Sequence, residues 1–277
     1  MTSIEPAAFR NLVYEKAAGV YRDLPWRHTR DPYAIMVSEY MLQQTQVARV
    51  VLKFNEWVRN FPNPAALASA PLAEVLRLWS GLGYNRRALA LVSACAIIVE
   101  KFEGRVPCEE NELRSLPGIG PYTARAIMAF AFDLPTVFLE TNIRTVILKH
   151  FFPDVTKVED KELELIAALI LDTTHPGSWY TAMMDYGAEI KKIEGNHSKR
   201  GASYRAQSAF ETSRRRVRGL VLKRVLESRV IGMDELRSIL PFTPEQIDES
   251  VLLLAREGFV AYDGTKISLS GPAEASL

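Results

Sequence analysis

Helical periodicity runs through most of this chain of 277 residues, and alternating, strand-like runs are scarce before residue 258. Apolar residues recur at helical spacing in the segments 63–84, 86–104 and 160–174, and the first two carry glycines near their ends. We therefore predict an all-α body. A hydrophobic content of 48% lets a chain of this length bury a sizeable core, in one large domain or two smaller ones.

The C-terminal part has a different pattern. Three short helical patterns at 215–228, 232–240 and 243–259 precede a segment in which Asp263-Gly264 separates two strand-like pieces, which is a hairpin signal. Three helices and a hairpin follow one another in a winged-helix module, and a small bundle packed on the main body is an equally open alternative. We expect three parts: a core over 1–190, a basic segment over 191–215 and a winged-helix-like domain over 216–277.

The net charge of +1 hides an uneven distribution. Residues 191–224 contain eleven Lys or Arg against two acids, whereas 225–277 and 1–190 are both net acidic. Such a basic segment attracts polyanions whatever the total charge of the chain. A solvated tether would have the same composition, and charge alone does not choose between these two interpretations.

The sequence argues against a membrane protein and against a disulfide-rich secreted one. No window reaches the roughly 18 apolar residues of a membrane span, and no basic stretch with an apolar run opens the chain. The two cysteines, Cys95 and Cys108, lack metal-ligand spacing and form no disulfide framework, so we expect both to be reduced. A cytosolic or nucleoid location follows.

The segment LPGIGPYTARAIMAFAF (116–132) predicts a hairpin between two helices. Gly118 and Gly120 permit positive φ and a close backbone approach, and we expect an Ala-rich helix to begin at Thr123. Amide N–H groups at such a turn can hold a phosphate, sometimes with a monovalent cation that bridges carbonyl and phosphate oxygens.

A lone acid, Glu39, stands among apolar residues in SEYMLQQTQV (38–47), and Gln43, Gln44 and Thr45 follow it. Together with PWR (25–27), DPY (31–33), LWSGLGYNRRA (78–88), LPGIGPYTARAI (116–127) and AMMDYGA (182–188), these motifs occur in a distinctive order. In that order the chain resembles the helix-hairpin-helix DNA glycosylases, most of all the MutY-type adenine glycosylases, over roughly residues 8–190. The resemblance implies two helical lobes around a cleft.

The resemblance makes Glu39 the general acid. Cleavage of an adenine N-glycosidic bond passes through an oxocarbenium-like state, and the base leaves readily once a ring nitrogen is protonated. A carboxylic acid in a semi-apolar pocket has a raised pKa and can supply that proton near neutral pH. An aspartate of the family stabilises the sugar, but here Glu140 takes its position, with Asn142 two residues later. Glu140 has one methylene more than an aspartate, which displaces its carboxylate. Either the pocket has adapted to the longer side chain or the catalytic activity has drifted.

Other roles also come from the resemblance. Tyr122 stands where relatives that cleave the DNA backbone, such as endonuclease III, have a lysine, so the resemblance implies a monofunctional enzyme. Tyr122 would line the pocket, or simply pack beside the hairpin. Gln44 and Tyr84 would wedge into the duplex, with Tyr84 as a helix-turn cap in the alternative, while Gln43 would flank the pocket and Thr45 the opposite strand.

The chain departs from the family after residue 188. Four cysteines that hold a [4Fe–4S] cluster in most relatives are missing, so we expect no cofactor beyond a monovalent cation at the hairpin. Basic residues would take over the backbone contacts of the cluster loop, namely Lys191, Lys192, Arg214, Arg215, Arg216 and Arg218. The family's domain that reads 8-oxoguanine is also not recognisable.

Two classes of function follow. The first is a monofunctional glycosylase for base excision repair that removes adenine opposite 8-oxoguanine or guanine, with mismatched thymine or uracil as the other substrates. The second is a catalytically drifted DNA-binding homologue. In both cases we expect a monomer whose partner is double-stranded DNA with a mismatched or damaged base, and no membrane partner.

Overall fold

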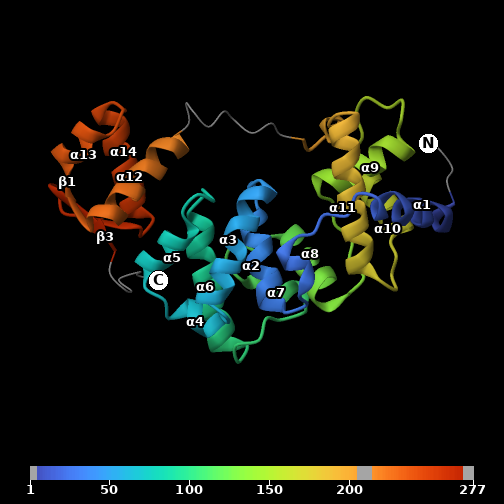
Figure 1. Ribbon diagram of the computed structural model, residues 1–277, viewed down its shortest axis with the longest axis horizontal. Coiled ribbons are helices and arrows are strands. Elements are labelled where there is room, and N and C mark those ends of the chain that lie inside the picture. Colours follow the sequence, from blue (N-terminus) through green and yellow to red (C-terminus); the bar gives the residue numbers. More distant parts are fainter. Residues whose placement is uncertain (1–4, 205–213, 271–277) are drawn as a thin grey trace. The chain divides into compact units, whose positions relative to one another are not determined.

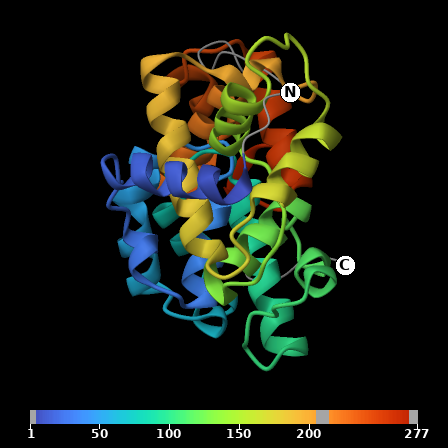
Figure 2. The ribbon, with the colours of Figure 1, turned by 90° about the vertical axis from the view of Figure 1, so that its right-hand side faces the viewer.

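The computed structural model describes residues 5–204 and 214–270. The described residues form two compact units, one made of 5–39 and 105–204 and the other of 40–104 and 214–270. Both units are mainly helical, as the coiled ribbons show in Figures 1 and 2. Helix α2 (Pro32–Leu42) contributes to both units, and the division follows Glu39.

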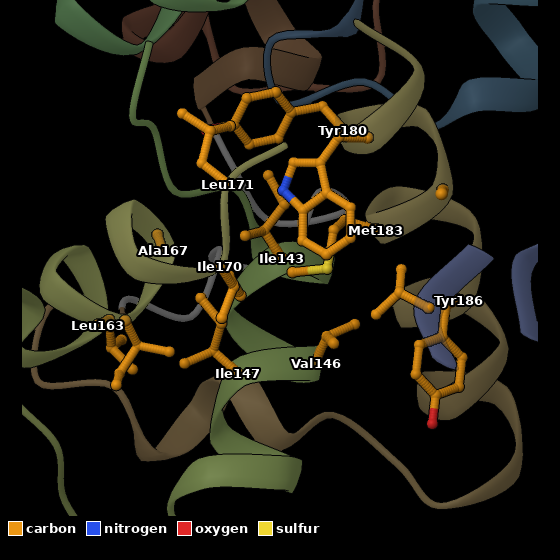
Figure 3. Close-up of a cluster of buried hydrophobic side chains, with 14 of the residues drawn as sticks. Ile143, Val146, Ile147, Leu163, Ala167, Ile170, Leu171, Tyr180, Met183 and Tyr186 are labelled. Atoms are coloured by element: carbon orange, nitrogen blue, oxygen red, sulfur yellow. The ribbon is translucent and has the colours of Figure 1, made fainter. Parts of the chain in front are cut away.

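The first unit is built of helices, several of which share an apolar core. They are α1 (Pro6–Ala18), η1 (Pro25–His28), α7 (Glu110–Ser115), α8 (Pro121–Phe132), α9 (Thr141–Phe151), α10 (Asp160–Ile170), α11 (Pro176–Ile193) and η2 (His197–Arg200). Side chains from α9, α10 and α11 meet in this core, among them Ile143, Ile170 and Met183 (Figure 3). The start of α9 is therefore held by packing on its inner face.

The second unit begins with four helices and ends with the C-terminal module. The helices are α3 (Val47–Asn60), α4 (Pro64–Ala68), α5 (Leu72–Trp79) and α6 (Arg86–Lys101). Trp57 and Trp79 are fully buried and meet edge to face, with their ring centroids 5.2 Å apart. The segment 63–84, expected as one helix, is two, because Pro71 has no N–H for a helix interior and stands at the N-cap of α5.

The C-terminal module has the expected three helices and hairpin. Its elements are α12 (Arg214–Ser228), β1 (Val230–Gly232), α13 (Met233–Ile239), α14 (Pro244–Arg256), β2 (Val260–Tyr262) and β3 (Lys266–Leu269). All strand pairs are antiparallel in the order β1-β3-β2, with Tyr262 opposite Ile267 around the hairpin. The prediction of an all-α body followed by a small winged-helix-like domain is confirmed.

The module is not isolated within its unit. Leu76 of α5 belongs to the same buried cluster as Val221 and Leu254, and Leu72 and Leu89 pack against it. Helix α11 continues through the expected domain limit at 190/191, and α12 spans the one at 215/216. No described helix is both long and apolar enough to cross a lipid bilayer.

Candidate active site

Glu39 lies near the end of α2 and is only 6% exposed. The helix starts firmly because the Asp31 carboxylate accepts hydrogen bonds from the backbone N–H groups of Tyr33 and Ala34, at 3.2 and 3.3 Å. Burial raises the pKa of Glu39 from its ordinary value of 4.5 to about 8, and the nearby Glu140 carboxylate adds to this. Glu39 therefore carries a proton at neutral pH.

Tyr122, in the first turn of α8, completes the surroundings of Glu39. Its hydroxyl donates a hydrogen bond to the Glu39 carboxylate, which partly opposes the rise in the pKa of Glu39. The Tyr122 ring meets Phe138 edge to face at 5.6 Å, and Phe138 stacks on Tyr180 at 3.9 Å. Burial raises the pKa of Tyr122 well above its ordinary value, so the phenol stays protonated. Pocket lining and aromatic packing, the two roles expected for Tyr122, are therefore compatible.

Glu140 is the N-cap of α9. Its Oε2 atom accepts from the Asn142 backbone N–H at 2.6 Å, and its Oε1 from the Asn142 side-chain amide at 3.4 Å. Burial raises the pKa of Glu140 and is the largest effect, so the pKa lies above its ordinary value although the Asn142 N–H, Lys191 and Arg22 each lower it. Among the described residues, the Tyr122 hydrogen bond is the contact that favours the ionised form of Glu39. We infer that the proton shared by these carboxyls resides on Glu39 and that Glu140 is the anion.

Two arginines and an aspartate support the site, and the sequence analysis missed all three. The Arg27 guanidinium binds both carboxylate oxygens of Asp185, at 2.7 and 2.8 Å, and Arg22 Nε binds Oδ1 at 2.5 Å. Burial alone would raise the pKa of Asp185, but hydrogen bonds from Arg27 and Arg22 outweigh it and the pKa is lowered. The ion cluster fixes Arg22, whose charge favours the Glu140 anion. Arg27 and Asp185 could have been found from the sequence, because they lie in the motifs PWR and AMMDYGA.

The hairpin between α7 and α8 differs in detail from expectation. Gly118 has a φ of +83°, as a tight turn requires, but Gly120 has a φ of −90° and is the N-cap of α8. The helix begins at Pro121 rather than Thr123, because proline suits the first helical position. The Thr123 side chain is 4% exposed. A Cβ at Gly120 would meet no protein atom within 4 Å, which leaves the turn open to a close neighbour.

Arg87 joins the end of α2 to the start of α6, a role that its place in LWSGLGYNRRA did not reveal. Nη1 donates to the carbonyls of Tyr40, Met41 and Gln43, and Nη2 to the Thr45 hydroxyl and the carbonyls of Leu82 and Gly83, all at 2.5 to 3.2 Å. Burial lowers the pKa of Arg87 to about 10, which leaves it charged at neutral pH. One guanidinium thus holds the two loops that carry Gln44 and Tyr84.

Gln44 and Tyr84 both have left-handed backbones, with φ of 54° and 50°. Such values are uncommon outside glycine and are kept only where the surroundings fix them. Arg87 binds the carbonyl just before each of them, Gln43 O and Gly83 O. The guanidiniums of Arg87 and Arg215 lie over the Tyr84 ring at 5.4 and 5.3 Å, and Arg215 also donates to the Tyr84 hydroxyl. Tyr84 is thus fixed by two arginines, and its carbonyl also accepts from the Arg87 backbone N–H at 2.9 Å at the start of α6, so both expected roles remain compatible with the structure.

Several of the basic residues make ion pairs within the protein. Lys192 approaches Glu189 at 3.7 Å and Arg214 approaches Glu249 at 3.1 Å. Arg218 binds both carboxylate oxygens of Glu257, whose side chain is 9% exposed. The side chains of Arg214 and Lys192 are 78% exposed, so their pairs are weak, whereas the Arg218 pair is structural.

The region that follows α11 is organised by an arginine. Arg200 Nη1 donates to the carbonyls of Phe152 and Val155 at 2.6 and 3.0 Å, and Nη2 donates to Leu148 O at 2.9 Å. These bonds satisfy carbonyls at the C-terminal end of α9. A thiolate-bound cluster does not fit, because the sequence has no cysteine after Cys108. In the part of the chain described here, no three His, Cys, Asp or Glu side chains gather as a metal site.

Comparisons with known proteins concern the family and the fold. Residues 37–170 match the family model of the HhH-GPD superfamily base excision DNA repair proteins. The chain is 39% identical to the adenine DNA glycosylase of Mycolicibacterium smegmatis over 172 residues, which cover 61% of this chain and 58% of that protein. It is also 39% identical to the Mus musculus adenine DNA glycosylase over 181 residues, which cover 61% of this chain and 35% of that one.

A solved structure of a thermostable thymine-DNA glycosylase has a similar fold. Its TM-score is 0.59 at 25% sequence identity, over 66% of this chain and 86% of the other. The matched region of the curated relatives spans little more than half of the bacterial enzyme and about a third of the mouse enzyme. The match to the family model covers the part of the helical core that contains Glu39, Tyr122 and Glu140.

Proposed function

We propose that this chain, whose residues 37–170 match the family model of the HhH-GPD superfamily base excision DNA repair proteins, is a monofunctional DNA glycosylase of that superfamily. Its substrate is adenine mispaired with 8-oxoguanine or guanine in double-stranded DNA, which agrees with the names of the relatives. The observation that carries the proposal is the pair of carboxyls in unlike environments. Glu39 is buried beside the Tyr122 phenol. The Glu140 carboxylate accepts a hydrogen bond from the Asn142 backbone N–H, and the charges of Lys191 and Arg22 favour its ionised form.

The chemistry divides between these two groups. With the adenine flipped out of the duplex, the neutral Glu39 carboxyl gives its proton to a ring nitrogen of the base. The C1′–N9 bond breaks and its electron pair leaves with the neutral base. The Glu140 carboxylate stabilises the cationic sugar while water attacks C1′, and the proton released by that water passes to a carboxylate. The products are adenine and an abasic site, and the strand remains intact.

DNA contacts lie in both units. Gln44 and Tyr84 act as wedges in the duplex, with Gln43 beside the flipped base and Thr45 toward the opposite strand. The turn at Gly118 and Gly120 approaches a phosphate closely, and the backbone of this turn would hold a monovalent cation, whose charge would favour the phosphate there.

The basic side chains add sequence-independent contacts to phosphates. Exposed Lys192 and Arg214 are the best placed, with Lys191, Arg215 and Arg216 as further members. Arg218 belongs to this set only if DNA competes with Glu257. We propose that the protein acts as a monomer on chromosomal DNA, which implies a nucleoid location.

A second substrate class is supported by one observation. The similar solved structure is named a thymine-DNA glycosylase, so mismatched thymine or uracil opposite guanine is the alternative substrate. The third candidate is a protein that binds DNA without excising a base, because Glu140 stands where the MutY-type glycosylases that the chain resembles have an aspartate.

The test is a panel of duplexes with adenine opposite 8-oxoguanine, adenine opposite guanine, thymine opposite guanine and uracil opposite guanine. Single-turnover reactions are followed by alkali, which cleaves abasic sites. We expect excision of adenine, fastest opposite 8-oxoguanine, and loss of excision in Glu39→Gln with duplex affinity retained. Excision of thymine alone would assign the alternative substrate, and no excision from any duplex would leave a binding protein.

A further inference from the structure

Gly187 lies on α11 where this helix meets the start of α9. A Cβ atom added to Gly187 would lie 2.3 Å from Asn142 O, 2.7 Å from Asn142 C and 2.8 Å from Asn142 Cβ. Real Cβ atoms do not approach backbone atoms so closely, so any side chain at 187 would displace the first turn of α9 or α11 itself. Glycine here is a requirement of close backbone approach.

The first turn of α9 cannot yield easily. Ile143 and Val146, the next inward-facing residues of α9, are buried in the core of the unit together with Met183 and Tyr186 from α11 (Figure 3). Cores at native density resist displacement, and overpacking is relieved by backbone shifts. A methyl group at 187 would therefore act on Asn142.

Asn142 is also the residue that positions Glu140. Its backbone N–H binds Glu140 Oε2 at 2.6 Å, and its side-chain amide lies 3.4 Å from Oε1. A shift of Asn142 would move the donor away from the carboxylate or carry the carboxylate with it. The contact between Gly187 and Asn142 is thus linked through one residue to Glu140.

We propose that Gly187 is a positioning residue for the Glu140 carboxylate. The absence of a Cβ at Gly187 sets the backbone of Asn142, and Asn142 sets Glu140. This inference rests on the proposed function, because it assigns to Glu140 a part in base excision. It also accounts for how a glutamate can serve in this position, since the backbone that carries it is fixed by contact with α11.

The same helix offers a matched control in Gly177. A Cβ at Gly177 would lie 3.0 Å from Ala129 O and 3.3 Å from the Asp133 carboxylate, at the end of α8. Gly177→Ala therefore also crowds a helix–helix contact of α11, but at a place that does not include Asn142 or Glu140. A general packing defect should appear in both variants.

The experiment compares Gly187→Ala and Gly177→Ala with the unchanged protein. We measure single-turnover excision on the duplex preferred by the unchanged protein, its pH dependence, duplex affinity and thermal unfolding. Gly187→Ala should excise about 100-fold more slowly, since a displacement near 1 Å at a reacting group has effects of that order. Gly177→Ala should excise at nearly the normal rate at a temperature where both variants are folded.

The pH dependence separates positioning from loss of structure. The Asn142 N–H lowers the pKa of Glu140, so its displacement should raise that pKa. The excision rate should fall at low pH, where Glu140 becomes protonated. This fall, the acidic limb of the pH profile, should move to higher pH in Gly187→Ala and not in Gly177→Ala. The effect of Glu140→Gln should also be smaller in the Gly187→Ala background than in the Gly177→Ala background.

The outcomes are distinguishable. If the unchanged protein excises a base and the two alanine variants have equal rates and equal acidic limbs, the inference is wrong while the proposed function stands. If the unchanged protein excises nothing, both fail. If Gly187→Ala does not fold, Glu140→Asp takes its place: a fixed backbone cannot follow the shorter side chain, so excision should fall about 10-fold or more. An unchanged rate in Glu140→Asp would then overturn the inference.

Discussion

Glu39 and Glu140 are carboxyl groups of the same chemistry that the fold places in different surroundings. Glu39 could be predicted from the sequence because a lone acid in an apolar helix is an unusual pattern, and Tyr122 and Glu140 from the motifs around them. The raised pKa of Glu39 was expected from its apolar neighbours, but the groups that act on Glu140 could not be predicted, because they are distant in the sequence. Tyr122 comes from α8, while Lys191 and Arg22 come from the two ends of the first unit's sequence.

The raised pKa of Glu39 has a consequence for stability. Its pKa in the folded protein is about 8 and its ordinary value is 4.5, so between these pH values the folded chain binds the extra proton. The free energy of unfolding should therefore fall as the pH rises from about 4.5 to about 8, by a few kcal/mol at most. Glu39→Gln should remove this fall. Urea denaturation at pH 5, 6.5 and 8.5 measures it, and parallel curves for both proteins would contradict the buried, neutral Glu39.

Tyr122 leads to a prediction about strand cleavage. A tyrosine cannot form a Schiff base with the sugar, so borohydride should trap little covalent protein–DNA adduct, and strand scission should need added base or heat. Tyr122→Lys is the matched variant, because it places an amine at the position where lyase relatives carry one. Efficient trapping by the unchanged protein would show that another amine reacts, and the monofunctional assignment would be wrong.

At the level of elements, the helices were largely predictable and their junctions were not. Periodicity located α6, α12 and α14, but the break at Pro71 and the three-residue strand β1 depend on single residues and on pairing with β3. The hairpin before α8 was recognised, yet only Gly118 has the positive φ expected of both glycines. Arg87 was missed for a similar reason, since six acceptors gather around it only after folding.

Arg87 should matter for base extraction as well as for stability. Lysine has three donors in a different geometry and cannot serve the same acceptors, so Arg87→Lys should lower the free energy of unfolding by about 1–3 kcal/mol. It should also reduce the flipped fraction of the target nucleotide, because the loops of Gln44 and Tyr84 lose their common support. Fluorescence of 2-aminopurine at the target position reports flipping. The exposed Arg77→Lys on α5 is the control, and equal flipping in both variants would contradict this role.

Over the whole molecule, the boundaries indicated by charge and by sequence similarity differ from the boundaries of the two compact units. The matched family region, 37–170, takes in parts of both units, and the C-terminal module shares a core cluster with Leu76. The sequence predicted the module and its basic flank. The sequence could not show which arginines are exposed and which are held in buried ion pairs. That depends on their partners, Glu249 and Glu257, which lie far along the chain.

The arginines of α12 should therefore separate into two groups. Replacing Arg214, Arg215 and Arg216 by Gln should weaken duplex binding across sequences and reduce the slope of log affinity against log salt by about 0.9 for each lost phosphate contact. The loss of Arg215, which binds Tyr84, should add a weakening that does not depend on salt. Arg218→Gln should instead lower the free energy of unfolding, because it leaves Glu257 with Arg86 alone. Arg224→Gln, on the same helix, is the control. An unchanged salt slope in the triple variant would exclude these side chains as phosphate ligands.

The central claim is that a neutral Glu39 protonates the departing base while Glu140 remains ionised. The most direct measurement is the pH dependence of single-turnover excision from the duplex with adenine opposite 8-oxoguanine, for the unchanged protein and Glu39→Gln. We predict a rate that declines as the pH rises through about 8, where Glu39 loses its proton, and no excision by Glu39→Gln at any pH. A rate that stays constant to pH 9.5, or turnover by Glu39→Gln, would contradict the account.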